Sequence, residues 1–356
     1  MMYKELISFQ NLHLAYKKAS KGKRRIPGVA AFELELEENL FQLHEELQNK
    51  TYQPGNYTSF FIHEPKRRLI SAAPFRDRVV HHALCNIIEP IFERSFIQDS
   101  YANRIGKGTH RALNRCQQFA RRFPYVLQCD LRQFFPSIDH EILRAALSLK
   151  ISDRDVLWLI DRILESGTGV LNEVYEMVYF SGDRQSAIHR PRGLPIGNLT
   201  SQFWANVYLN PFDHFVKREL GCKGYARYVD DVLFFAKDKA ILWQWKGLIQ
   251  ERLQQLRLTI HPHAHPRPVE EGIPFLGFIV YPQRRRLKRR KGVHFQRKLR
   301  SLLTRVSHGG IPLSRVSASV LGWVNHVRYG NTIGLCKSVL GKLSLRKDRK
   351  CGEGIP

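Results

Sequence analysis

The sequence predicts an α+β fold in which an antiparallel β-sheet is covered by helices on one face. The first observation is the order of elements in the middle of the chain: strand, helix, excursion, helix, hairpin, helix, strand. The second observation is composition. The 356 residues are 43% hydrophobic and 11% aromatic, which is enough for a sizeable core and excludes a chain that is disordered throughout.

The N-terminal third is expected to combine helices with two extended segments. Apolar residues recur at helical spacing from Phe32 to Lys50, and the Pro-Gly pair within Tyr52–Asn56 ends that helix. The other elements expected here are extended segments at 57–63 and 67–72 and helices at 79–92 and 109–123.

A compact apolar run at 125–129 predicts a buried strand that ends at Asp130. Ser137 and Asp139 are suited to cap a helix that runs to Leu149. The polar, glycine-containing stretch 166–192 is expected to form a hairpin-like excursion. The remaining expected elements are helices at 199–220 and 238–256, a strand, acidic turn and strand at 225–235, strands at 258–260 and 273–281, helices at 295–306 and 314–327, and a weaker last helix.

The net charge of +25, from 57 Lys and Arg against 32 Asp and Glu, indicates a polyanionic partner. Residues 282–356 hold 19 Lys and Arg and only 2 Asp and Glu, so most of the excess lies there. A basic run can be a solvated tail or a localisation signal. Here Leu287, Phe295 and Leu299 are interleaved with the charges, which favours a folded basic surface.

Membrane and secreted classes are not expected. No apolar stretch approaches the length of a membrane span, and the first residues lack the apolar core of a signal peptide. The six cysteines are scattered without a Cys-x-x-Cys pair, so we expect reduced thiols, no zinc site and a cytoplasmic protein.

Three carboxylates mark the candidate catalytic centre. Asp130 ends the predicted strand, and Asp230 and Asp231 lie between two strongly apolar segments. Adjacent like charges repel and carboxylates are poor strand formers, so a simple structural turn explains the pattern less well than a cation site. Such oxygen ligands suit Mg²⁺, and two ions would activate a 3′-hydroxyl and stabilise a leaving pyrophosphate.

Tyr228-Val229-Asp230-Asp231 in a hairpin, preceded by a strand that ends in aspartate, resembles the palm of reverse transcriptases. The resemblance runs from about Tyr57 to Thr332. It implies an RNA-directed DNA polymerase of right-hand architecture, in which the two Mg²⁺ ions are bound by Asp130, the backbone carbonyl of Leu131, Asp230 and Asp231. The implied units are an N-terminal helix and fingers at 1–124, a palm at 125–281 with a finger-side excursion at about 151–193, and a basic helical thumb at 282–356.

The same resemblance assigns a nucleotide site. Lys66 and Arg68 stand in a segment similar to the fingers motif and would contact the incoming triphosphate. Phe135, five residues after Asp130, holds the steric-gate position, where a ring would clash with a ribose 2′-hydroxyl. Deoxynucleotides are therefore the expected substrates.

The segment from Gly193 to Gln202 resembles that of the reverse transcriptases of diversity-generating retroelements. In group II intron and retron enzymes, Gln stands at the position of Ile196. We place Ile196, Gly197 and Gln202 at the nucleotide site. Ile196 offers only van der Waals contact where Gln could hydrogen-bond, and loss of a polar check weakens discrimination against imperfect pairs. The resemblance implies copying errors at template adenines and mutagenic retrohoming of the cDNA into a variable repeat.

The expected partners are a structured template-repeat RNA, the RNA/DNA duplex, dNTPs and, by resemblance, a small basic accessory variability protein that is oligomeric. Two residues of a motif that usually contacts template or supports the fingers are Arg104 and Lys107. The basic residues expected to bind the duplex backbone are Arg284, Arg285, Arg286, Lys288, Arg289, Arg290, Lys291, Arg297 and Lys298.

Several alternatives stay open. Reverse transcriptases commonly carry a Lys that can protonate the pyrophosphate; this chain has His261-Pro262-His263-Ala264-His265 there, so His263 or His265 could be the acid, or the segment could be a surface loop. A retron-type or phage-defence reverse transcriptase is the alternative within the class. A non-catalytic RNA-binding or maturase-like protein is the alternative outside it.

Overall fold

A central antiparallel sheet organises the chain, as the sequence predicts. The computed structural model describes residues 2–63, 67–183 and 185–341. Every strand pair in the central sheet is antiparallel. The strand order is β4 (Gly224–Tyr228), β5 (Asp231–Ala236), β3 (Tyr125–Arg132) and β6 (Thr259–Ile260), with β7 (Pro266–Pro268) also paired to β3. β3 thus continues past Asp130, which the sequence placed at the end of the strand.

Helices cover both faces of this sheet, so the expectation of one covered face is wrong. Successive side chains along a strand point to opposite faces. Phe234 points into the core shared with α10 (Leu199–Arg218) and α11 (Lys239–Gln255). Phe235 points to the other face, where α6 (Thr109–Arg122) covers it. A strand buried on both faces is apolar throughout, so its sequence does not show how many faces are covered.

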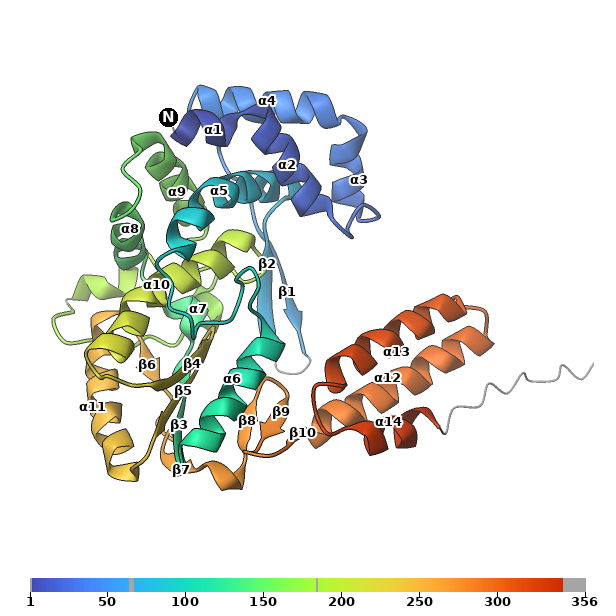
Figure 1. Cartoon of the computed structure of the whole chain (residues 1–356). Helices are drawn as coiled ribbons and strands as arrows, with labels where there is room; N and C mark the ends of the chain where they lie inside the picture. The colour runs from blue at the N-terminus through green and yellow to red at the C-terminus, as the bar shows by residue number, and fades with distance from the viewer. Residues whose placement is uncertain (1, 64–66, 184, 342–356) are drawn as a thin grey trace, which may run out of the picture.

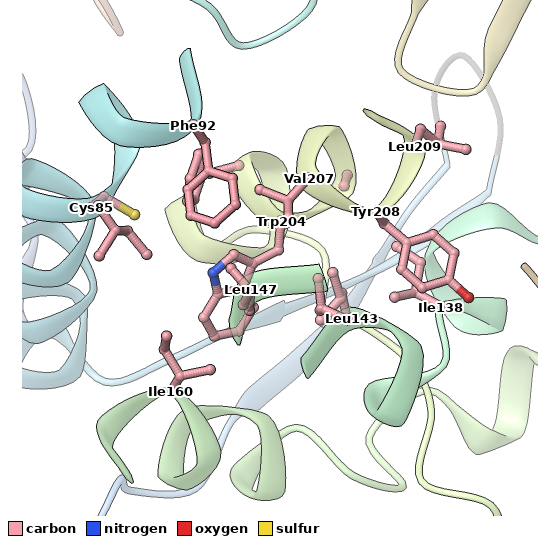
Figure 2. Packing of buried hydrophobic residues seen from close by; sticks show 14 of the residues in the cluster. Cys85, Phe92, Ile138, Leu143, Leu147, Ile160, Trp204, Val207, Tyr208 and Leu209 are labelled. Carbon is pink, nitrogen blue, oxygen red and sulfur yellow. The ribbon is translucent and has the colours of Figure 1, made fainter. Parts of the chain in front are cut away.

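Trp204 of α10 lies at the centre of the larger core and is buried (Figure 2). The helices around it are α5 (Phe75–Glu93), α8 (His140–Ser148) and α9 (Arg154–Ser166). The core residues that these helices contribute are Cys85, Phe92, Leu143, Leu147 and Ile160. Asp139 caps α8, as predicted, whereas α9 was not expected.

Four N-terminal helices lie over α5 (Figure 1): α1 (Met2–Ile7), α2 (Phe9–Ser20), α3 (Pro27–Leu34) and α4 (Leu36–Gln48). The single helix expected over 32–50 is interrupted at Glu35, whose φ of −118° and ψ of 47° are not helical. α1 and α2 were not expected. α1 has only 6 residues, which is too short to display a helical apolar period.

The two predicted extended segments are present, and they pair as an antiparallel ribbon, which the sequence did not predict. Its strands are β1 (Thr58–Ile62) and β2 (Arg68–Ala72). The ribbon extends from the helical part of the molecule toward the C-terminal helices (Figure 1).

The stretch 166–192 has no strand among its described residues, so the hairpin predicted there is wrong. It contains two short 3-10 helices, Asn172–Val174 and Gln185–His189. An ion-pair cluster holds it in place: Arg190 lies 3.1 Å from the Asp139 carboxylate and 2.9 Å from that of Asp183, and all three side chains are buried. Such a cluster leaves no periodic pattern in the sequence.

The C-terminal part combines a small sheet with three helices that stand to one side of the molecule (Figure 1). Its elements are β8 (Ile273–Phe275), β9 (Phe278–Val280), β10 (Arg285–Leu287), α12 (Arg289–Ser307), α13 (Leu313–Val327) and α14 (Ile333–Leu340). Phe295 and Trp323 stack with centroids 4.3 Å apart in a small core of their own. The three predicted helices are present, and β10 is an element that was not expected.

The division into units 1–124, 125–281 and 282–356 stays a prediction. Its first boundary separates α6 from the sheet that α6 covers. In the part of the chain that the structure describes, no helix is both long and apolar enough to cross a membrane.

We expect Trp204→Ala to lower the free energy of unfolding by about 3–5 kcal/mol, because it leaves a large cavity in the core. Trp243→Ala is the matched control, since this indole is 49% exposed on α11. The control should shift the free energy by about 0.5 kcal/mol or less. Urea denaturation followed by circular dichroism measures both, and equal losses would contradict the assignment of Trp204 to the core.

Candidate active site

The pairing of β3 with β5 brings the three predicted carboxylates together. Asp130 and Asp231 are register partners. Partners directly opposite in an antiparallel pair project to the same face, with Cβ atoms about 4.5–5.5 Å apart. Asp230 lies in the turn between β4 and β5, and its carbonyl accepts a hydrogen bond from the Leu131 N–H at 3.2 Å. The β-ladder therefore places all three aspartates at one end of the sheet.

The turn that carries Asp230 has a strained backbone. Val229 has φ of +57°, which a β-branched residue rarely adopts. Arg227 supports this conformation: one guanidinium nitrogen donates to the Val229 carbonyl at 3.2 Å, and two others donate to the Asp213 carboxylate at 2.8 and 2.6 Å. Because Arg227 and Asp213 are both buried, either one alone would be a costly unpaired charge.

Crowding of like charges alters the titration of Asp231. Burial, followed by the charges of Asp230 and Asp130, raises the pKa of Asp231 to about 6. Lys288 and a hydrogen bond with Gln128 lower that pKa in part. A cation near these carboxylates would relieve the repulsion.

The donors present suit a hard divalent cation. Mg²⁺ usually binds one or two carboxylates and completes its shell with waters and substrate phosphates. Among the described residues, no three or more His, Cys, Asp or Glu side chains form a ready-made metal site. Asp130, Asp230, Asp231 and the Leu131 carbonyl stay the predicted Mg²⁺ ligands, and their oxygen atoms are of the kind that Mg²⁺ prefers.

Two cavities meet at the carboxylates, and Asp130, Asp230 and Asp231 line both. The first has a volume of about 770 Å³ and extends toward α12. Its basic residues are Arg68, Arg267, Lys288, Arg290 and Lys291. The second has a volume of about 810 Å³ and extends toward the β1–β2 ribbon. The reacting centre is therefore open on two sides.

The second cavity gathers three of the six residues predicted to bind nucleotide. Arg68, Phe135 and Ile196 all line it. Gln202 is exposed on α10 and is not among the residues that line either cavity. Lys66, the other predicted triphosphate contact, lies outside the described residues.

Gly197 and Asn198 join the β1–β2 ribbon to this cavity. Gly197 has φ of +124°, and a Cβ there would lie 3.1 Å from Ile70 of β2, so glycine permits the close approach. The Asn198 side-chain amide donates to the Ser71 carbonyl at 2.9 Å, and its oxygen accepts from the Ala73 N–H at 3.1 Å. This buried clamp was not anticipated, because its partners are far apart in sequence.

The predicted contacts Arg104 and Lys107 are engaged within the protein. The Arg104 side chain is 5% exposed and pairs with Glu93 at 2.7 Å. Lys107 donates to the backbone and side-chain oxygens of Gln98 at 2.8 and 2.9 Å. Both contacts support the fold of this loop, and neither residue lines the two cavities at the carboxylates.

The predicted basic surface divides into three groups. Lys288, Arg290 and Lys291 face the carboxylate cavity. A separate hollow of about 780 Å³ on α12 is lined by Arg289, Arg290, Arg297 and Lys298. Arg284 and Arg286 are exposed beside β10. Arg285 differs from all of these: it is buried, and its side chain donates to the Tyr329 carbonyl at 3.4 Å, which is a structural role.

The histidine nearest the carboxylates is His261, whose Nε2 lies 3.6 Å from Asp130 Oδ2. Its backbone N–H also donates to the Asp130 carbonyl at 3.1 Å. His263 and His265, the residues considered as proton donors, line only the first cavity. Their catalytic role stays a prediction.

Comparison with known proteins places the chain in a family. Residues 62–280 match the family model described as reverse transcriptase (RNA-dependent DNA polymerase). The chain is 25% identical over 325 residues to protein YkfC of Escherichia coli K12, which covers 75% of this chain and 80% of YkfC. It is 27% identical over 183 residues to the group II intron-encoded protein LtrA of Lactococcus lactis, which covers 51% of this chain and 28% of LtrA.

Two further similarities cover a shorter part of the chain or have a lower sequence identity. The chain is 31% identical over 113 residues to nuclear intron maturase 1 of Arabidopsis thaliana, which covers 31% of this chain and 16% of that protein. Among solved structures, a Candida tropicalis telomerase truncated from its C-terminal domain superposes with a TM-score of 0.47 and 11% identity, covering 68% of this chain and 59% of that one.

We expect Asp231→Asn to raise the melting temperature in metal-free buffer at pH 7.5. The folded-state pKa of about 6 lies above the ordinary value of 3.8, so the folded chain binds more protons between these values and loses stability as pH rises through them. The variant lacks this loss of stability. The difference in melting temperature between the variant and the wild type should therefore shrink as the pH falls from 6 toward 4.

Differential scanning fluorimetry across pH 4–8 (about half-unit steps) measures the difference. Glu270→Gln, an exposed carboxylate outside both cavities, is the control and should leave the wild-type pH dependence intact. Parallel curves for wild type and Asp231→Asn would contradict the raised pKa.

Proposed function

The chain belongs to the reverse transcriptase (RNA-dependent DNA polymerase) family, and on this premise we propose that it copies RNA into DNA with Asp130, Asp230 and Asp231 as its catalytic carboxylates. The observation that carries the proposal is their position. The three aspartates lie together where two cavities meet, one bordered by basic residues of the C-terminal part and the other by the β1–β2 ribbon. A polymerase needs this arrangement because the primer and the nucleotide reach the same point from different sides.

In this proposal, the incoming nucleotide occupies the second cavity. Arg68 binds its phosphates by charge-assisted hydrogen bonds, and the Phe135 ring lies where it excludes a 2′-hydroxyl. Ile196 packs near the nascent base pair. The primer terminus occupies the first cavity, where Lys288, Arg290 and Lys291 balance backbone phosphates.

The aspartates would hold two Mg²⁺ ions, which when bound assist loss of the 3′-hydroxyl proton and stabilise the leaving pyrophosphate. The chain itself positions their ligands. β3–β5 pairing aligns Asp130 with Asp231, and Arg227 maintains the turn that presents Asp230. Lys288, which also offsets the carboxylate charge, lies within reach of the same cavity.

We further propose that the chain is the reverse transcriptase of a diversity-generating retroelement. Support comes from Ile196, which lines the nucleotide cavity where related enzymes carry Gln, and from the segment that continues to Gln202. The proposed partners are a structured template-repeat RNA and a small basic oligomeric accessory protein. The product cDNA would replace a variable repeat in a target gene.

A second candidate function is favoured by the names of the relatives. LtrA is encoded by a group II intron, and another relative is an intron maturase. A chain that binds intron RNA would use the same basic surfaces. The three carboxylates favour the polymerase, because binding alone does not require crowded like charges.

The assay is incorporation of dTTP on a poly(rA) template with an oligo(dT) primer and Mg²⁺. We expect Asp230→Ala to lower the rate of incorporation by at least about 10³-fold, which corresponds to roughly 4 kcal/mol of lost transition-state stabilisation. Asp155→Ala, an exposed aspartate on α9, is the matched control and should retain wild-type activity. If wild type and Asp230→Ala extend the primer equally, the polymerase proposal fails.

We expect Ile196→Gln to lower misincorporation opposite template adenine, by about tenfold, because an amide restores a polar check on the base pair. Sequencing of cDNA made on one adenine-containing RNA template measures the error spectrum. Ile241→Gln on the exposed face of α11 introduces the same change outside the site. An unchanged spectrum for Ile196→Gln would refute the role given to Ile196.

A further inference from the structure

The second cavity has a wall that the proposed function leaves unused. Residues of the stretch 166–192 line it opposite the ribbon, in the same cavity as Phe135 and Ile196. These wall residues are Leu171, Glu173, Val174, Tyr175 and Glu176. They lie about 40 residues after β3 in sequence, so their position at the cavity depends on contacts between distant segments of the chain.

Gln133 provides that attachment. Its side-chain oxygen accepts a hydrogen bond from the Glu176 N–H at 2.7 Å, and its side-chain nitrogen donates to the Glu176 carbonyl at 3.4 Å. One primary amide thus pairs with both backbone groups of a single residue, as a neighbouring strand would. Both hydrogen bonds are exposed to solvent. The Arg132 guanidinium also pairs with the Glu176 carboxylate, and this exposed ion pair contributes little.

Gln133 connects the catalytic strand to the residue predicted to act as steric gate. It lies between β3 and α7 (Phe134–Ser137), with φ of +48° in the left-handed region. Its carbonyl accepts the Ser137 N–H at 2.9 Å, which closes the single turn that carries Phe135. Left-handed backbone at a non-glycine residue is strained, and such strain clusters at functional positions.

The wall is also held at a second point. The Arg192 guanidinium lies 4.2 Å from the centroid of the Tyr175 ring, and it donates to the Ile188 carbonyl at 3.2 Å. Neighbouring Arg190 belongs to the buried cluster with Asp139. Arg190 and Gln133 thus tie the segment at two points, to Asp139 at the start of α8 and to the end of β3.

We propose that Gln133 is a specificity-determining positioning residue, which fixes the 171–176 wall so that Phe135 can distinguish deoxyribose from ribose. A steric gate excludes a 2′-hydroxyl only if the nucleotide cannot shift away from the gate, and a displacement of about 1 Å is enough to change reactivity greatly. The wall prevents this shift. The inference rests on the proposed function, because it assigns a sugar-selective role within the same site.

The test separates the backbone contact of residue 176 from its side chain. We call the two hydrogen bonds between the Gln133 side chain and the backbone of residue 176 the latch. Gln133→Ala removes the side chain that makes both of them. Glu176→Pro removes the shorter of the two hydrogen bonds, because proline has no N–H to donate. The preceding Tyr175 has φ of −104° and ψ of 122°, which proline tolerates in its neighbour. Glu176→Ala keeps the backbone N–H and removes only the carboxylate. Gln254→Ala, exposed on α11, controls for the substitution itself.

The measurement is kcat/KM for dTTP and for UTP in primer extension on poly(rA). We expect Gln133→Ala and Glu176→Pro each to reduce the preference for dTTP by about tenfold, and Glu176→Ala and Gln254→Ala to leave it within about twofold. The double variant Gln133→Ala/Glu176→Pro should match either single variant, because both remove one contact. Hydrogen exchange across 171–180 should rise in the two latch variants only.

Other results overturn the inference. If the latch variants lower kcat/KM for both nucleotides by the same factor, Gln133 has only a structural role. If exchange at 171–180 is unchanged in these variants, the latch does not hold the wall. A wild-type chain that incorporates neither nucleotide refutes the proposed function, and the specificity role with it, whereas an active wild type with unaltered variants refutes the latch alone.

Discussion

Asp130 and Asp231 oppose each other across neighbouring strands, and much of the surrounding structure serves to maintain that unfavourable pair. Like charges placed directly opposite in a sheet are destabilising. Burial, then the charges of Asp230 and Asp130, raises the pKa of Asp231. The strands withstand this cost because β3 and β5 are central and packed on both faces. Phe234 and Phe235 alone bury aromatic rings on opposite sides of the same strand. The apolar core thus supplies the stability that a crowded catalytic centre requires.

Side-chain amides join segments of the chain that are far apart in sequence. Asn198 pairs with the backbone of β2, Gln133 pairs with the backbone of Glu176, and the Asn331 oxygen accepts the Arg285 N–H at 2.9 Å at the base of the C-terminal helices. In each case a side-chain amide makes the hydrogen bonds to backbone groups that a paired strand would otherwise make. Such a contact fixes position with one or two hydrogen bonds. Asn198 and Gln133 thus attach the ribbon and the wall to neighbouring segments without adding a strand to the central sheet, and the Asn331 contact joins two segments of the C-terminal part.

Much of the fold could be predicted because its signals are local. The strand runs, the acidic hairpin and most helices follow from apolar spacing and caps, as Asp139 at the start of α8 illustrates. The failures have a common cause. α1 is too short to display a period, and the stretch 166–192 is held by the buried Asp139–Arg190–Asp183 cluster instead of by an apolar face. Neither feature can be detected in a window of consecutive residues.

The sequence by itself determined the family and the identity of the chemical groups. Asp130, Asp230, Asp231 and Phe135 were recognisable because their spacing along the chain carries the motif. Only the tertiary structure decided which basic and polar residues serve the site. Arg104 and Arg285 look like phosphate contacts in sequence, yet Arg104 pairs with Glu93 and Arg285 donates to the Tyr329 carbonyl. Arg227 supports the turn that carries Asp230, and Gln133 holds a wall of the second cavity. The physical reason is that a charge or an amide acquires its role from partners far away in the chain, and a motif records only near neighbours.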